Sequence, residues 1–173
     1  MDGHTPESLR RLLNMVYSRG KLLSKATGGT FSVDRELLEA LDEAGTITNR
    51  EDFISIAQEH GGLTGITFDD GKINFTGYPF SYDVEKTKAF QQLTGMMNKH
   101  ALEQKRIQAK AVNDANEKYI FRIWMVRLGM DGSEYKEARH VLMENLSGHT
   151  AFRTKADEEK WKARQQAKRD ELR

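Results

Sequence analysis

The chain has 173 residues, of which 38% are hydrophobic and 31% charged, a balance typical of globular rather than disordered proteins. It contains no cysteine, which excludes disulfides, thiolate zinc sites and cysteine nucleophiles. The sequence shows neither an apolar run of membrane-spanning length nor a secretory signal, so we expect a cytoplasmic protein with no membrane partner.

The net charge of +1 hides an asymmetry between the two halves of the chain. Residues 1–80 hold 8 Lys and Arg against 12 Asp and Glu, whereas residues 81–173 hold 19 against 14. The second half therefore suits contact with a polyanion, or with an acidic protein face, better than the first half does.

Three amphipathic helices are predicted in the first 61 residues. The first begins at Thr5 and Pro6 and stops near Gly28, where a left-handed cap is favoured. The second is expected over residues 33–44. The third is expected to follow a capping box formed by Thr48 and Glu51 and to end at Gly61.

The stretch from Leu63 to Phe80 changes to an alternating apolar pattern. Asp69, Asp70 and Gly71 interrupt that pattern at the place where a hairpin needs its turn. The same three residues resemble half of a calcium loop, but the closing glutamate is missing, so a β-hairpin packed against the helices is the prediction.

Four more helices are predicted in the second half. One runs from Asp83 toward residue 111, and one over residues 114–128 buries Tyr119, Ile120, Ile123, Trp124, Val126 and Leu128. Another follows a capping box of Asp131 and Glu134, and a long C-terminal helix covers residues 155–173. Trp161 is the only large apolar residue of this last segment, which is therefore expected to be a solvated helix or a partner-binding arm.

These elements predict an α+β fold that is mainly α. We expect residues 1–80 to form a three-helix lobe with one β-hairpin, and residues 81–173 to form a basic helical lobe, together making one compact unit.

Catalytic signatures are missing from the sequence. The five histidines do not have the spacing of a metal site, and the glycines near helix ends are not followed by a phosphate-binding lysine. His140 lies near Glu137 and Glu144, which suits either an oriented base or surface charge pairs. We expect no metal, no cofactor and no small-molecule substrate, and an enzyme only if residues converge from distant segments.

Basic and aromatic residues of the second half are the candidates for partner binding, because such side chains neutralise phosphates and stack on bases. Mixed charges around them also suit a merely solvated surface, and Trp124 at helical spacing suits a core position. The candidates are Lys99, Lys105, Arg106, Lys110, Arg122, Arg127, Lys160, Trp161, Lys162, Arg164, Lys168 and Arg169.

The segment EKYIFRIWMVRLGMDGSEYKEARHVLMENLSGHTAFR, residues 117–153, is similar to one found in small proteins of plasmids, phages and conjugative elements of gut bacteria, described as virulence-related. With the preceding lobe, the whole chain resembles the type II anti-CRISPR proteins. The resemblance implies a non-enzymatic inhibitor that binds Cas9 or its complex with guide RNA and blocks DNA recognition or cleavage, with double-stranded DNA as a further partner. It carries over no catalytic residue.

Two other functions stay open at this point. The chain could be a DNA-binding accessory or regulatory protein of a conjugative element or phage, or an enzyme with a dispersed site. A chain of net charge +1 with a basic second half is a poor mimic of DNA, so an inhibitor would act by wedging against a protein surface or by holding an inactive conformation.

Overall fold

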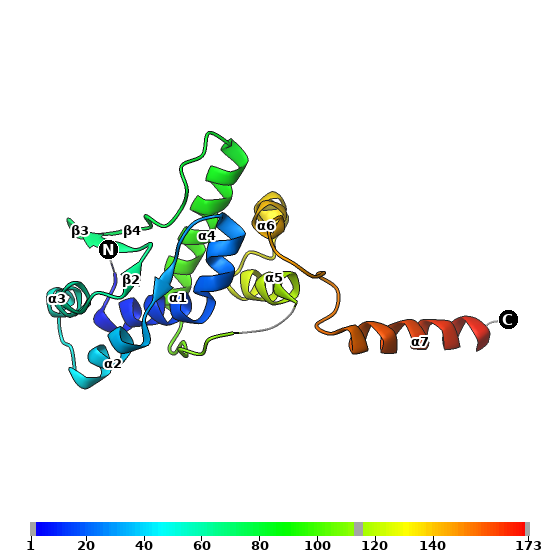
Figure 1. The fold of residues 1–173 in the computed structure, drawn as a ribbon, viewed down its shortest axis with the longest axis horizontal. Helices are drawn as coiled ribbons and strands as arrows, with labels where there is room; N and C mark the ends of the chain where they lie inside the picture. Colours follow the sequence, from blue (N-terminus) through cyan, green and yellow to red (C-terminus); the bar gives the residue numbers. More distant parts are fainter. Residues whose placement is uncertain (1–2, 113–115, 172–173) are drawn as a thin grey trace.

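Helices dominate the protein. The computed structural model describes residues 3–112 and 116–171, with the side chains described up to residue 167 (Figure 1). Its α-helices are α1 (Pro6–Thr27), α2 (Arg35–Glu43), α3 (Arg50–His60), α4 (Val84–Glu103), α5 (Glu117–Arg127), α6 (Lys136–Met143) and α7 (Lys155–Glu171). A 3₁₀ turn, Ser133–Tyr135, precedes α6. The predicted α+β, mainly α class is confirmed.

Two small antiparallel strand pairs accompany the helices. The predicted hairpin is confirmed: β3 (Thr67–Asp69) pairs with β4 (Lys72–Asn74). Asp70 and Gly71 form its turn with φ of 48° and 69°, as a two-residue turn between twisted strands requires. The second pair, β1 (Ser32–Val33) with β2 (Leu63–Thr64), corrects the expectation of one hairpin and places Val33 in a strand instead of α2.

Helix α1 begins and ends as predicted. The Thr5 hydroxyl accepts a hydrogen bond from the Ser8 N–H at 3.3 Å, and the Ser8 hydroxyl accepts one from the Thr5 N–H at 2.9 Å. Gly28 closes the helix with φ 71°. This reciprocal cap satisfies two backbone donors that a helix end otherwise leaves unpaired.

Other predicted helix starts shift by one or more residues. Asn49, not Thr48, caps α3, because its side chain accepts from the Asp52 N–H at 2.8 Å. The predicted box of Asp131 and Glu134 does not form, and the 3₁₀ turn starts without a side-chain cap. Asn116 caps α5, and the predicted start at Asp114 lies outside the described residues.

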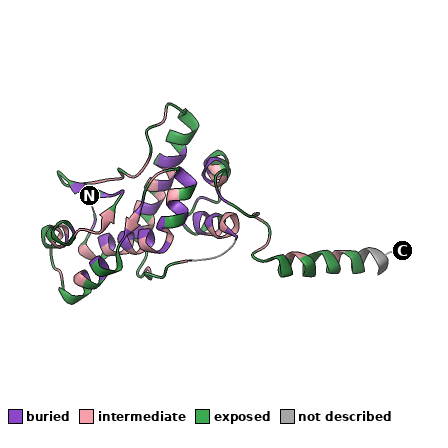
Figure 2. Ribbon diagram, viewed as in Figure 1, coloured by how far each residue is buried: buried purple, intermediate pink, exposed green. Residues whose placement is uncertain are grey.

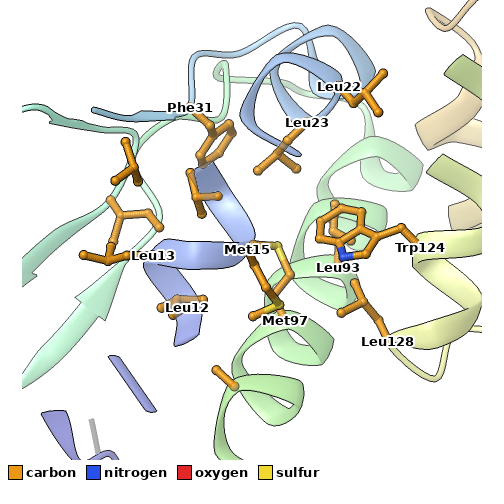
Figure 3. Packing of buried hydrophobic residues seen from close by; sticks show 14 of the residues in the cluster. Leu12, Leu13, Met15, Leu22, Leu23, Phe31, Leu93, Met97, Trp124 and Leu128 are labelled. Atoms are coloured by element: carbon orange, nitrogen blue, oxygen red, sulfur yellow. The ribbon is translucent and has the colours of Figure 1, made fainter. Parts of the chain in front are cut away.

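The core forms where α4 packs against α1 and α6, and α5 packs against α6. Figure 3 shows Trp124 and Leu128 extending from α5 toward Met15 and Leu93. The predicted inward face of α5 is partly wrong. Its buried residues are Phe121, Trp124 and Met125, while Val126 is 37% exposed and Tyr119, Ile120 and Ile123 are only partly buried. Helix α5 carries apolar side chains on most of its own faces, so the periodicity of the sequence alone does not identify which face is buried.

Helix α4 ends at Glu103, well before residue 111. Residues 104–112 follow as non-helical backbone laid along α1, and we call this segment the strap. The prediction of a basic helical stretch over residues 99–110 is therefore wrong beyond Glu103.

Helix α7 extends away from the rest of the protein, and most of its described surface is exposed (Figure 2). The prediction of a long C-terminal helix is not confirmed, because its 17 residues make it shorter than α1 and α4. Within the described residues, no helix combines the length and the apolar character that crossing a bilayer demands.

Candidate anion-binding groove

Three polar side chains on one face of α1 hold the strap in place. Arg11 donates from Nε to the Ala101 carbonyl at 2.8 Å, just before the strap begins. Asn14 donates to the Ile107 carbonyl at 2.7 Å, and the Ser18 hydroxyl accepts from the Lys110 N–H at 3.0 Å. Residues 11, 14 and 18 of a helix share a face, so α1 presents one row of partners to the backbone of the strap.

A groove of about 850 Å³ runs between the strap, α1 and the connection from α2 to α3. Its floor is partly apolar, with Leu41, Ile47, Phe53 and Ile107 contributing to the lining. Its charged lining consists of five cations and two acids: Arg10, Arg11, Lys105, Arg106, Lys110, Glu7 and Asp42. The groove therefore carries a surplus of positive charge although residues 1–80 are acidic overall.

Arg10 and Arg11, two of the three arginines of α1, are held by hydrogen bonds, and the cations of the strap are not. Arg10 donates to the Leu38 carbonyl at 2.6 Å and to Oδ2 of Asp42 at 3.0 Å. By contrast, the exposed side chains of Lys105, Arg106 and Lys110 make no ion pair within the described part of the chain. Their charges are available to an incoming anion.

Glu7, one of the two acids of the groove lining, has a lowered pKa. A hydrogen bond from Thr5 and the nearby charge of Arg11 hold the pKa of Glu7 below its usual range. Asp42 is already shared with Arg10 at 3.0 Å. Even with both carboxylates counted as negative, the five cations of the lining outnumber them, so the groove suits anionic ligands.

The structure brings only part of the predicted candidate set together. Lys105, Arg106 and Lys110 meet in the groove, whereas Lys99 lies on α4 within 3.8 Å of Glu103. The other candidates lie elsewhere: Arg122 and Arg127 are exposed on α5, and α7 carries Lys160, Trp161, Lys162, Arg164, Lys168 and Arg169.

The α7 candidates have their own local partners. Lys162 lies 2.7 Å from Glu158, and this pairing raises the pKa of the Lys162 ammonium. Trp161 packs against Phe152 with ring centroids 5.6 Å apart and remains 49% exposed. Lys168 and Arg169 belong to the last part of α7, where only the backbone is described.

Sequence reasoning missed Arg10 and Arg11 as members of the groove. Both belong to the acidic half of the chain and lie beside the apolar stripe of α1. An arginine in such a position usually keeps its charged group in solvent. No local pattern connects them with residues 105–110, which are more than ninety positions away. The arginines of α1 and the basic residues of the strap come together only because the strap packs against α1.

The side chains of the groove suit the binding of anions. Guanidinium and ammonium groups bind phosphate and carboxylate oxygens, and a partly apolar floor accommodates a sugar or an aliphatic side chain. The lining contains no histidine. No group of three or more metal-binding side chains occurs in residues 3–112 and 116–171.

Comparisons of the chain with protein-family models, with curated proteins and with solved structures find no match.

Proposed function

We propose that this protein is a non-enzymatic inhibitor that binds Cas9, or Cas9 with its guide RNA, and blocks target DNA recognition or cleavage. The cationic groove between α1 and the strap supports the proposal, because Lys105, Arg106 and Lys110 stand exposed beside Arg10 and Arg11. The type II anti-CRISPR resemblance supplies the identity of the partner.

The groove favours one mode of inhibition over another. A DNA mimic would display carboxylates where DNA displays phosphates, but this groove has five cations and two acids. A cationic surface instead complements the sugar-phosphate backbone that Cas9 exposes around its guide. The protein would then hold the complex in a state that does not admit or cut target DNA.

A cleavage assay tests the proposal. Purified Cas9 loaded with guide RNA cuts a linear duplex in the presence of a molar excess of the protein, and we expect the initial cleavage rate to fall at least about tenfold, as blocking a conformational checkpoint would require. The triple variant Lys105→Ala, Arg106→Ala, Lys110→Ala should lose most of the inhibition.

A matched variant with three cations changed on α7, Lys160→Ala, Lys162→Ala, Arg164→Ala, should retain inhibition. It has the same charge change as the strap variant but alters a helix that projects from the core (Figure 1). A cleavage rate unchanged at excess wild-type protein would refute Cas9 inhibition. Equal losses in the two triple variants would refute the role of the groove.

A DNA-binding accessory protein of a mobile element is the second candidate, and the basic surplus of residues 81–173 favours it. Phosphate contacts release counterions, so the logarithm of duplex affinity should fall with the logarithm of salt concentration by about 0.9 per contact. Removing the three strap cations should then flatten that slope by about 2 to 3. Duplex binding with this salt dependence, without any effect on Cas9, would select this candidate.

A further inference from the structure

The most exposed large apolar side chains of the described residues lie close together at the start of α4. Phe80, Tyr82 and Val84 are 84%, 91% and 78% exposed. The next most exposed, Trp161, reaches 49%. Phe80 and Tyr82 contact each other edge to face, with ring centroids 4.8 Å apart. Exposed apolar side chains gathered in this way mark a contact surface, whereas single ones do not. We call residues 80–88 the aromatic tip.

The aromatic tip is held in place by contacts on both sides of its two rings. Before the tip, the Tyr78 ring stacks on Phe90 with ring centroids 4.6 Å apart. After the rings, the Asp83 carboxylate accepts hydrogen bonds from the N–H groups of Glu85 and Lys86 at 2.9 and 3.1 Å, and so caps α4. Because these contacts fix the backbone, a partner that covers the rings orders little additional chain.

Packing within the described chain does not account for the tip. Residues 82–88 are all exposed. Figure 1 shows the start of α4 projecting beyond its neighbours, and the same end of the helix is exposed in Figure 2. Ala89 and Phe90, which follow, are buried and belong to the core. The apolar residues before them have no such role, so their burial requires another molecule.

One face of the tip combines an apolar residue with one acid and one base. Val84 precedes Lys88 by four positions and Glu85 precedes it by three, so the three side chains share a face of α4. Neither Glu85 nor Lys88 makes an ion pair within the described residues. If two such faces pack antiparallel about a two-fold axis, Glu85 of each copy meets the partner's Lys88. The face is therefore complementary in charge to itself.

The charge of the tip also argues against a nucleic acid as its partner. Residues 80–88 contain two acids and two lysines, so their net charge is zero. Binding to phosphates depends on a surplus of basic side chains, which the tip does not have. A second copy of the same surface fits both its apolar residues and its balanced charges.

We propose that the aromatic tip is a homodimer contact, through which two copies of this chain associate. An aromatic side chain buries about 150–250 Å², so the four rings of a pair contribute about 600–1,000 Å². Specific protein interfaces bury about 1,200–2,000 Å² in total, and Val84 and the stems of the lysines bring the contact to the lower end of that range. A contact of this size is weak, and we expect a Kd in the micromolar range.

Sedimentation equilibrium of the purified protein tests this contact without Cas9. The wild type should change from monomer to dimer as its concentration rises from about 1 to 500 µM, which spans the expected Kd. The double variant Phe80→Ala, Tyr82→Ala should raise the dimer Kd by about tenfold or more, because it removes the apolar area that association buries. Both residues are exposed, so the circular dichroism spectrum of the double variant should match that of the wild type.

Trp161→Ala is the matched control, since Trp161 is an exposed aromatic residue of α7. It should leave the dimer Kd unchanged. A wild type that stays monomeric at every concentration would overturn the proposal, as would equal weakening by the control and by the double variant. If the wild type were always monomeric and the double variant lost Cas9 inhibition, the tip would belong to the contact with Cas9 instead.

Exchanging the charges tests the two-fold arrangement without removing an aromatic ring. Glu85→Lys leaves only bases on the shared face, and Lys88→Glu leaves only acids. Each variant alone should dimerise about threefold or more less tightly than the wild type, because like charges then face each other. An equimolar mixture of the two variants should associate more tightly than either variant alone. A mixture that gains no affinity over the separate variants would contradict the proposed contact.

Discussion

Helices α1 and α7 show two ways in which a helix of this chain is stabilised. Helix α1 buries more than half of its 22 residues and forms a reciprocal N-terminal cap. Helix α7 has exposed side chains along most of its described length and contacts the preceding segment through Trp161 on Phe152 and through Glu158 near His149 (Figure 2). Packing holds the first helix, whereas local propensity and charge pairs hold the second.

This difference distinguishes residues that determine the stability of the fold from residues that are exposed to a binding partner. Changes in the α1–α4 core should mainly lower the free energy of unfolding. Changes in the strap should alter binding and leave the fold intact, and changes in the exposed side chains of α7 should also leave the fold intact. Substitutions in buried and in exposed positions therefore test whether burial decides the size of the effect.

The largest effect is expected from truncation inside the core. Leu93 of α4 is completely buried, and Leu93→Ala should lower the free energy of unfolding by about 2–5 kcal/mol, because it removes apolar contacts and leaves a cavity. Leu102→Ala, on the same helix but 36% exposed, should cost less than about 1 kcal/mol. Urea denaturation followed by circular dichroism measures both, and equal losses would show that burial does not rank these positions.

A smaller loss of stability is expected at low pH, because His4 is then protonated. Its ring lies buried, with Nδ1 2.8 Å from the Ser8 hydroxyl oxygen and Nε2 2.7 Å from Oδ1 of Asn98 on α4. Burial lowers the pKa of His4 below its ordinary value of 6.5, and the charges of Arg11 and Arg50 act in the same direction. The unfolded chain therefore binds a proton at this residue more readily than the folded chain does.

The sign of the pH effect follows from this difference. The contribution of His4 is complete above the unfolded pKa of about 6.5 and is lost as the pH falls toward the lower folded pKa. We expect the stability of the wild type to fall below pH 6.5 more steeply than that of His4→Asn, by urea denaturation over a pH series. His140→Asn, which changes an exposed histidine, is the control and should follow the wild type. A steeper fall in His4→Asn than in the wild type would contradict the assignment.

Local signals in the sequence predict the helices with strong caps and one clear apolar stripe. Thr5, Pro6 and Gly28 delimit α1, and the turn of Asp70 and Gly71 identifies the hairpin. The pairing of β1 with β2 joins residues about thirty positions apart, and two-residue strands leave no alternating pattern to detect.

The strap shows why the candidate site was only partly predictable. Residues 104–110 include good helix formers, but side chains of α1 bind their backbone carbonyls and amides, and this tertiary contact overrides propensity. The sequence identified Lys105, Arg106 and Lys110 by charge alone. It did not identify Arg10 and Arg11, because the contact between α1 and the strap is long-range.

The smallest effect on stability is expected at Trp161, and the contrast with Trp124 makes it testable. Trp161 is 49% exposed and touches Phe152, whereas Trp124 is 7% exposed within the core. Trp161→Ala should cost less than about 1 kcal/mol of unfolding free energy, while Trp124→Ala should cost about 3–5 kcal/mol. These are the only two tryptophans of the chain, so Trp161→Phe and Trp124→Phe each leave one fluorophore. Acrylamide should quench the remaining Trp161 more strongly than the remaining Trp124. Equal quenching would mean that α7 is covered in solution, so its side chains would belong with the packed core and not with the exposed surface available to a partner.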